Sequence, residues 1–234
     1  MSMSDSWKDP KFAKDYMDNA TDTNMNWYEH FVNAESLWSL IPKSTRHALD
    51  FGCGPGEFTA ALAKKGYSVD GCDGSEAMVT LATETYPDIN FFVWDGSTND
   101  EHSNTKYDAI ISKLTLHFID DLHILASNFR PLLRGKGHVI VSVPHPMPTI
   151  SKAHGVDFEE VSYDTEIGSY GMHVTMIHRS LQDYINPFLD NGFVLTKIVE
   201  PQISQEIIEK FSVRQEYAAI PRRLNLRFQK AELL

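Results

Sequence analysis

The sequence of 234 residues is poor in cysteine and contains no long apolar run. Its two cysteines, Cys53 and Cys72, cannot supply the disulfide framework of a small secreted protein. No segment approaches the roughly 20 apolar residues that a membrane-spanning helix requires, and residues 1–10 lack the apolar stretch of a signal peptide. These absences predict a soluble, cytoplasmic protein that does not bind a membrane.

Basic residues are also in short supply. The chain has 21 Lys and Arg against 32 Asp and Glu, so its formal net charge is −11. Because such a balance repels a phosphate backbone, we expect no nucleic-acid partner. The hydrophobic share of 42% and the length suit one globular domain with at most a small cap, as a monomer or a homodimer.

Short apolar segments alternate with amphipathic ones from His47 onwards, a pattern typical of strands and helices in turn. The strands are expected at residues 47–51, 67–72, 89–94, 107–112, 138–143, 193–199 and 224–228. The helices are expected at residues 27–40, 58–65, 75–85, from Asp120 or Asp121 to Leu132, 180–191 and 203–218. This order predicts an α/β fold whose mostly parallel sheet has helices on both faces.

The strongest local signal is a glycine-rich turn between the first predicted strand and the next helix. Gly52, Gly54 and Gly56 stand at alternate positions, where they permit a tight turn and a close approach of a ligand to the backbone. A dinucleotide fingerprint would place its third glycine at position 57, but the residue there is Glu57. A carboxylate beside a pyrophosphate is unfavourable, so a nucleoside ligand without phosphates fits the turn better. A turn without any ligand is the alternative.

Two aspartates follow the next two strands. Asp73 ends the second strand, where it can accept hydrogen bonds from both ribose hydroxyls, and Asp95 ends the third, where it can accept from an adenine amino group. The alternatives are a helix cap for Asp73 and a turn residue for Asp95. The carboxyl ends of neighbouring parallel strands are where open sheets bind ligands.

These segments together resemble the class I S-adenosylmethionine-dependent methyltransferases of the small-molecule type. The resemblance is carried by Leu49-Asp50-Phe51-Gly52-Cys53-Gly54-Pro55-Gly56, Gly71-Cys72-Asp73-Gly74-Ser75-Glu76-Ala77-Met78, Trp94-Asp95-Gly96, Tyr107-Asp108-Ala109-Ile110-Ile111-Ser112 with Leu116-His117, and Leu132-Leu133-Arg134-Gly135-Lys136-Gly137. It implies a Rossmann-like sheet of seven strands and S-adenosyl-L-methionine as the cofactor. It also implies a helical lid over residues 1–44 and a methyltransferase domain over residues 45–234, in which residues 144–177 form a cap inserted after the fifth strand.

The resemblance also assigns cofactor contacts. The residues implied are Asp50, Gly52, Cys53 and Gly54 at the methionine part, Asp73 at the ribose, Gly74, Met78, Asp95 and Gly96 around the adenine, and Lys113 and Leu114 after the fourth strand. Relatives more often carry a small or apolar residue in place of Lys113, whose side chain has the alternative of reaching solvent. The Asn/Asp-Pro-Pro-Tyr motif of enzymes that methylate amino groups of bases or glutamine is missing after the fourth strand.

A general base is needed only if the acceptor carries a proton on its nucleophile. His117 and His145 follow the fourth and fifth strands, so we expect them as candidate bases, with Tyr28 orienting the acceptor. Packing roles are the alternative for all three. No histidine pair with a third partner has the spacing of a metal site, so no metal is expected. Two other functions stay open: an NAD-dependent oxidoreductase and a non-catalytic binder of S-adenosylmethionine.

Overall fold

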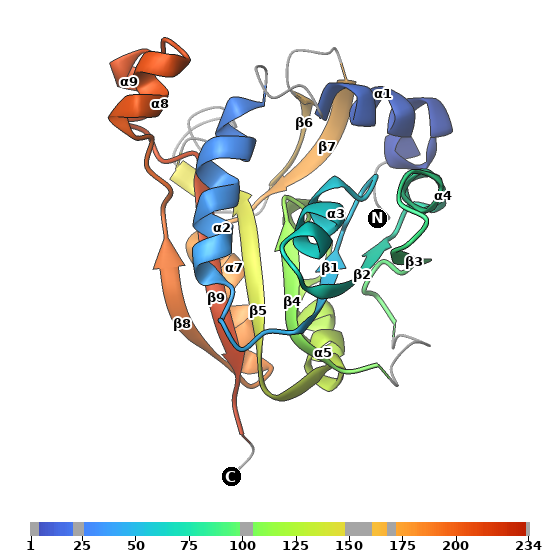
Figure 1. Cartoon of the computed structure of the whole chain (residues 1–234). Helices are drawn as coiled ribbons and strands as arrows, with labels where there is room; N and C mark the ends of the chain where they lie inside the picture. The colour runs from blue at the N-terminus through green and yellow to red at the C-terminus, as the bar shows by residue number, and fades with distance from the viewer. Residues whose placement is uncertain (1–4, 21–25, 99–104, 148–160, 168–171, 233–234) are drawn as a thin grey trace.

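A seven-stranded sheet forms the centre of the computed structural model, which describes residues 5–20, 26–98, 105–147, 161–167 and 172–232 (Figure 1). The strands lie in the order β3 (Asn90–Val93), β2 (Ser68–Asp73), β1 (His47–Phe51), β4 (Tyr107–Lys113), β5 (Leu133–Pro144), β9 (Arg223–Lys230) and β8 (Phe193–Val199). Strand β9 runs antiparallel to both of its neighbours, and the pairs from β3 to β5 are parallel. The predicted fold class is therefore confirmed.

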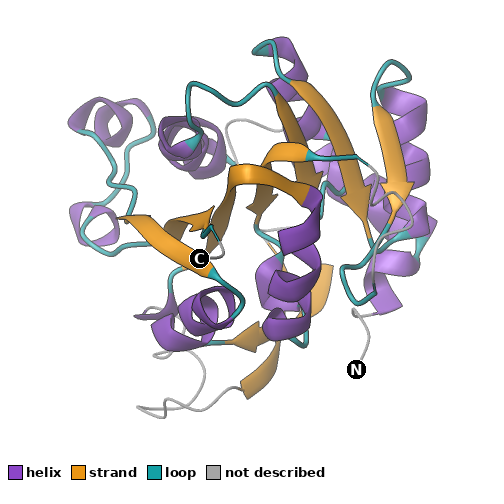
Figure 2. Cartoon of the chain, turned by 90° about the horizontal axis from the view of Figure 1, so that it is seen from below, coloured by secondary structure: helices purple, strands orange, loops and turns teal. Residues whose placement is uncertain are grey.

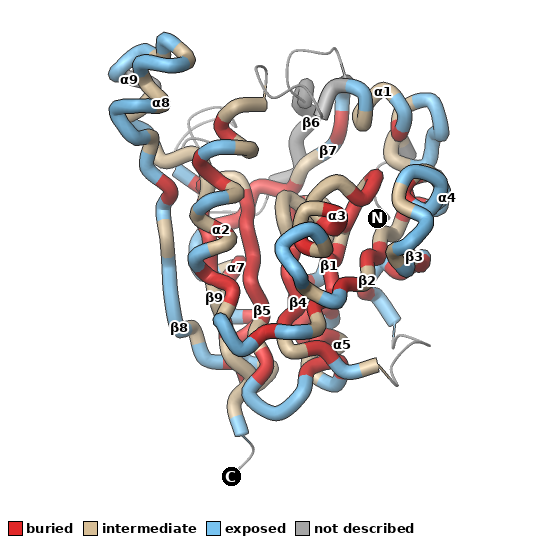
Figure 3. The backbone as a smooth tube through the Cα atoms, viewed as in Figure 1, coloured by how far each residue is buried: buried red, intermediate tan, exposed pale blue. Residues whose placement is uncertain are grey.

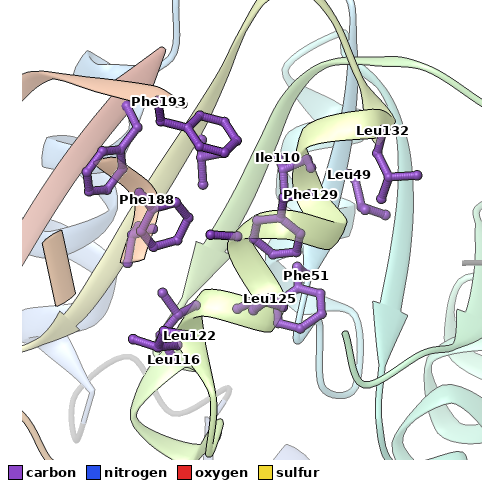
Figure 4. Close-up of a cluster of buried hydrophobic side chains, with 14 of the residues drawn as sticks. Leu49, Phe51, Ile110, Leu116, Leu122, Leu125, Phe129, Leu132, Phe188 and Phe193 are labelled. Carbon is purple, nitrogen blue, oxygen red and sulfur yellow. The ribbon is translucent and has the colours of Figure 1, made fainter. Parts of the chain in front are cut away.

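Helices cover both faces of this sheet (Figure 2). Alternate residues of each central strand point to opposite faces, so two apolar clusters form. Helices α2 (Ala34–Leu40) and α3 (Glu57–Lys64) pack on the face that carries Ala48, Ile111 and Ile140. Helices α5 (Leu122–Leu132) and α7 (Leu181–Asp190) pack on the other face, where Figure 4 shows their aromatic and leucine side chains together.

The helices begin where side chains satisfy their first backbone N–H groups. Asp121, not Asp120, caps α5 by accepting hydrogen bonds from the N–H groups of His123 and Ile124. Ser75 caps α4 (Glu76–Thr85) through the N–H of Met78. Because caps of this kind are local in sequence, these helix starts follow the prediction within a residue.

Three predicted elements differ from the structure. The strand predicted at 138–143 begins at Leu133, directly after α5, so residues 135–137 belong to β5. The helix predicted at 27–40 opens with the wider π-helical turn η2 (Glu29–Asn33), whose Asn33 side chain bonds to Glu29. The helix predicted at 203–218 is two short ones, α8 (Gln205–Lys210) and α9 (Gln215–Ala218), because Ser212 between them has a φ of +50°.

Two segments lie against this core. The N-terminal 3-10 helix η1 (Asp5–Lys8) and the helix α1 (Pro10–Ala20) both contact α4. Helix α1 lies beside α4 (Figure 1). Within the predicted cap, β6 (Val161–Ile167) and β7 (Met172–His178) pair as an antiparallel hairpin. Residues 148–160 and 168–171 of that cap lie outside the described residues.

Burial follows the position of each strand in the sheet (Figure 3). Strands β1 and β4 are mostly buried, and β5 is buried from Val139 to Val143, whereas the edge strand β8 is largely exposed. The described helices include none that is long and apolar enough to cross a bilayer. The central strands therefore provide a rigid base whose carboxyl ends carry the candidate site.

Candidate cofactor pocket

A pocket of about 440 Å³ lies at the carboxyl ends of β1, β2 and β4. A volume of this size is in the range of small-molecule sites in proteins. Ten of the predicted cofactor residues line it: Asp50, Gly52, Cys53, Gly54, Asp73, Gly74, Met78, Asp95, Lys113 and Leu114. Further lining side chains come from the N-terminal elements and α3, among them Trp7, Tyr16, Glu29, His30, Trp38, Glu57 and Phe58.

The glycines of the turn serve different purposes. Gly52 has a φ of +72°, and a Cβ there would lie 2.1 Å from the Thr115 hydroxyl oxygen. Gly54 has a φ of +53°, and a Cβ there would meet nothing within 4 Å. Packing therefore requires glycine at position 52, whereas at Gly54 the backbone borders the open space of the pocket.

Both carboxylate oxygens of Asp73 accept hydrogen bonds from the backbone. Its Oδ2 accepts the N–H of Gly54 at 2.9 Å, and its Oδ1 accepts the N–H of Ser75 at the same distance. Burial raises the pKa of Asp73, and these two backbone bonds oppose the rise. Each carboxylate oxygen can accept more than one bond, so Asp73 retains capacity for two ligand hydroxyls. The helix cap is Ser75 and not Asp73, so the backbone bonds of Asp73 leave its predicted ligand role open.

Asp50 lies beneath the turn and is fully buried. Burial raises its pKa from 3.8 to about 7, against the opposing effects of the Thr59 hydroxyl, which donates to Oδ2 at 2.6 Å, and of the Lys113 charge. A buried carboxylate that ionises near neutral pH is stabilised by a bound cation. The position therefore suits an ammonium group.

At the end of β3, only one of the two predicted residues reaches the pocket. Asp95 lines it, and its Oδ1 accepts both the N–H and the hydroxyl of Ser97. Gly96 is not among the lining residues, and a Cβ on it would lie 2.2 Å from Leu125 Cδ1. Packing against α5 accounts for this glycine without any contact to a ligand.

Lys113 is the last residue of β4, and Leu114 follows it directly. The Lys113 ammonium lies 3.6 Å from Glu29 Oε2 and 5.8 Å from the Phe58 ring centre, and its side chain is 22% exposed. Leu114 has a φ of +59°, which is uncommon for a residue with a side chain, and its N–H donates to Ser142 O. The strained backbone at Leu114 turns the chain into the loop that carries Thr115 and Phe118 to the pocket.

The three residues predicted to be catalytic do not line this pocket. Burial, followed by the charges of Arg223 and Arg179, lowers the pKa of His117 to about 3. His145 is buried, with Nε2 at 2.7 Å from Glu200 and Nδ1 accepting the N–H of Met147. Burial raises the pKa of Tyr28 to about 12, and its hydroxyl donates to Pro201 O. All three side chains face other parts of the fold.

Trp7, Glu29 and His30 are among the lining residues that were not predicted as site residues. The Trp7 ring packs edge-on against Tyr16 and against Phe118 of the β4 loop. Aromatic residues spaced through an otherwise polar N-terminus are the signal that could have identified Trp7. Glu29 and His30 have no such signal, because only the docking of η2 on the sheet brings them to the pocket.

The geometry defines a nucleoside-type site at the carboxyl end of a class I methyltransferase fold. Within the described ranges, no group of three or more His, Cys, Asp or Glu is arranged to hold a metal ion. A family model described as a methyltransferase domain matches residues 28–197, most of the chain. The chain belongs to this family, and the predictions of a methyltransferase and of S-adenosylmethionine as its cofactor are confirmed.

Individual relatives differ in what they methylate. A putative S-adenosylmethionine-dependent methyltransferase from Listeria monocytogenes is 26% identical, with a TM-score of 0.69 over 85% of this chain and 96% of that one. A trans-aconitate 2-methyltransferase from Delftia acidovorans is 28% identical over 53% of this chain and 49% of its own. A ribosomal protein L11 methyltransferase from Campylobacter fetus is 31% identical over 48% and 42%. The chain thus spans about half or less of the length of these two curated relatives.

Proposed function

We propose that the protein transfers a methyl group from S-adenosylmethionine to a small-molecule acceptor. The observation that carries this proposal is one pocket in which Asp73 and Asp50 border the same space as Glu29, His30 and Trp38. Asp73 and Asp50 suit a nucleoside that carries an ammonium group. Glu29, His30 and Trp38 border the part of the pocket that we assign to the acceptor. The relatives named trans-aconitate 2-methyltransferase support a small acceptor for this chain.

The described residues fit this cofactor. We assign Asp73 to the ribose hydroxyls, Asp95 to the adenine amino group and Asp50 to the ammonium of the methionine part. The bound cofactor supplies a methyl group made electrophilic by its sulfonium. Gly54 leaves the turn open for the methionine part, because nothing lies within 4 Å of where its Cβ would be.

The chain contributes mainly position and the exclusion of water. Trp7 and Tyr16 come from the predicted lid and line the pocket beside residues of the strand ends. We propose that the described part of the predicted lid, residues 5–20 and 26–44, encloses the bound cofactor, as the hydrogen bond that the Ser75 hydroxyl donates to Trp7 O supports; residues 1–4 and 21–25 lie outside the described residues. An acceptor enclosed in this way is small, which favours a metabolite-sized molecule over a folded protein.

The pocket also bears on the general base. Among the described histidines, His30 lines the pocket, whereas His117 and His145 do not. A hydroxyl acceptor would use His30, and a carboxylate acceptor would need no base at all. The proposed function therefore does not require His117 or His145 as a base.

Calorimetry with S-adenosylmethionine, S-adenosylhomocysteine and NAD tests the cofactor. We expect both adenosyl ligands to bind and NAD not to bind. Transfer of a labelled methyl group to a metabolite-sized acceptor, detected by intact mass, then separates an enzyme from a non-catalytic binder. Binding of NAD alone, or transfer only to a protein acceptor, would contradict the proposal.

A further inference from the structure

Lys113 occupies a distinctive place in the pocket. It ends β4, which lies beside β1 on the side opposite to β2. Asp73 ends β2, so the glycine turn after β1 separates Lys113 from the residue assigned to the ribose. A cofactor held at Asp73 and at the turn would thus have Lys113 on the side of the turn opposite to its ribose.

The nearest carboxylate does not require Lys113 as its partner. Glu29 Oε1 accepts bonds from Arg223 Nε at 2.7 Å and Nη2 at 2.6 Å, and Glu29 Oε2 accepts from Asn33 Nδ2 at 2.7 Å. Burial alone would raise the pKa of Glu29, but the Arg223 charge, followed by that of Lys113 and by the hydrogen bonds, lowers it. The two bonds from Arg223 to Oε1 already compensate the charge of this carboxylate, whose side chain is 16% exposed.

Lys113 itself remains under-coordinated. Its Nζ lies 3.6 Å from Glu29 Oε2, beyond hydrogen-bonding distance, and 5.8 Å from the Phe58 ring centre. The described residues supply no shorter polar contact to this ammonium. A largely buried ammonium without hydrogen bonds is costly, and the charge lines a pocket large enough for a ligand.

We propose that Lys113 binds a carboxylate in the pocket and that the methyl acceptor is a small carboxylic acid, an inference that rests on the proposed function. A carboxylate placed between Lys113 and the sulfonium is attracted by both cations. Its oxygen bonds to the methyl carbon, the carbon–sulfur bond breaks, and the electron pair stays on sulfur, which becomes a neutral thioether. No proton is released, which agrees with the positions of His117 and His145 outside the pocket.

The methionine part of the cofactor carries a carboxylate too, so the test must distinguish two sources. Helix α3 begins at Glu57 after Gly56, and its first N–H groups offer that carboxylate a separate place. If Lys113 instead holds the methionine carboxylate, its removal weakens S-adenosylhomocysteine but not 5′-methylthioadenosine, which lacks the amino acid.

The experiment uses the full chain saturated with S-adenosylhomocysteine, which cannot donate a methyl group. Thermal shifts are measured with mono-, di- and tricarboxylic acids of up to about six carbons and with the methyl ester of each, and the best acid is titrated by calorimetry. The variants are Lys113→Met, Lys113→Arg and the control Lys65→Met, because Lys65 lies over the Trp38 ring and does not line the pocket.

We expect at least one acid to stabilise the protein more than its ester does. Lys113→Met should weaken that acid at least tenfold, as loss of a charge-assisted bond predicts. Lys113→Arg should retain part of the affinity for the acid, and Lys65→Met should not change it. In Lys113→Met the affinity for S-adenosylhomocysteine should fall less than the affinity for the acid, because Lys113 affects the cofactor site only through the pKa of Asp50.

Three results would overturn the proposal: acids and esters of equal effect, an unchanged acid affinity in Lys113→Met, or a loss confined to S-adenosylhomocysteine. If the unmodified protein bound no S-adenosylhomocysteine, the proposed function itself would fail.

Discussion

Replacing Asp73 with alanine removes the acceptor that we assign to the ribose hydroxyls. A hydrogen bond to a charged group contributes about 1.5–3 kcal/mol, so the affinity for S-adenosylhomocysteine should fall about 10- to 150-fold. The change also leaves the N–H groups of Gly54 and Ser75 without their present acceptor. Some destabilisation of the turn is therefore expected, and a lower affinity alone does not establish a contact with ribose.

A ligand cycle separates the two effects. S-adenosylhomocysteine and its 2′-deoxy analogue are titrated by calorimetry into the unmodified protein and into Asp73→Ala. The 2′-deoxy analogue should bind the unmodified protein more weakly than S-adenosylhomocysteine does. The two ligands should bind Asp73→Ala with similar affinity. Asp70→Asn is the matched control, because Asp70 is on the same strand, bonds to Tyr107 and does not line the pocket. If removal of the 2′-hydroxyl lowered the affinity by the same factor in both proteins, the assignment of Asp73 to the ribose would be refuted.

Four further predictions concern the pocket and the buried histidine. The raised pKa of Asp50, about 7, means that cofactor affinity should increase between pH 6 and pH 8 as the carboxylate ionises, and Asp50→Asn should abolish this dependence in calorimetry. The same raised pKa favours the protonated folded state, so the melting temperature of the unliganded protein should fall relative to that of Asp50→Asn as the pH rises from about 4 to 7. Gly52→Ala, with a Cβ 2.1 Å from Thr115 Oγ1, should lower the melting temperature and weaken the cofactor, and an unchanged melting temperature would contradict the packing argument. His117→Asn should change the single-turnover rate by less than tenfold, because a ring with a pKa near 3 outside the pocket is a poor base, whereas a 100-fold loss would restore the histidine as a base.

The fold could be predicted closely because its signals are local. Apolar runs of the right length stop at Gly52, Asp73 and Lys113, and the strands end at or next to these residues. Caps such as Asp121 depend on residues two or three positions away. The π-helical turn at Glu29–Asn33 was not predicted, because it lies where buried Asn33 bonds to Ser142 of the distant strand β5.

The cofactor half of the pocket was also predictable, because parallel strands bring their carboxyl ends to the same edge. The sequence order of the strands therefore places Asp50, Asp73 and Asp95 together without knowledge of any side-chain packing. Gly96 shows the limit of this reasoning, since a position next to a predicted ligand residue can face the core. A glycine motif by itself does not distinguish a ligand contact from a packing contact.

By itself, the sequence determined the class of fold and the position of the glycine turn, because periodicity and turn residues act over a few neighbouring positions. Only the tertiary structure decided which side chains outside the strand ends line the pocket. His117 and His145 follow the correct strands, yet the turn of the backbone after each strand directs both rings into the fold. Glu29 and His30 reach the pocket because the N-terminal elements dock on strands distant in sequence. Such contacts depend on long-range packing, which no local pattern encodes.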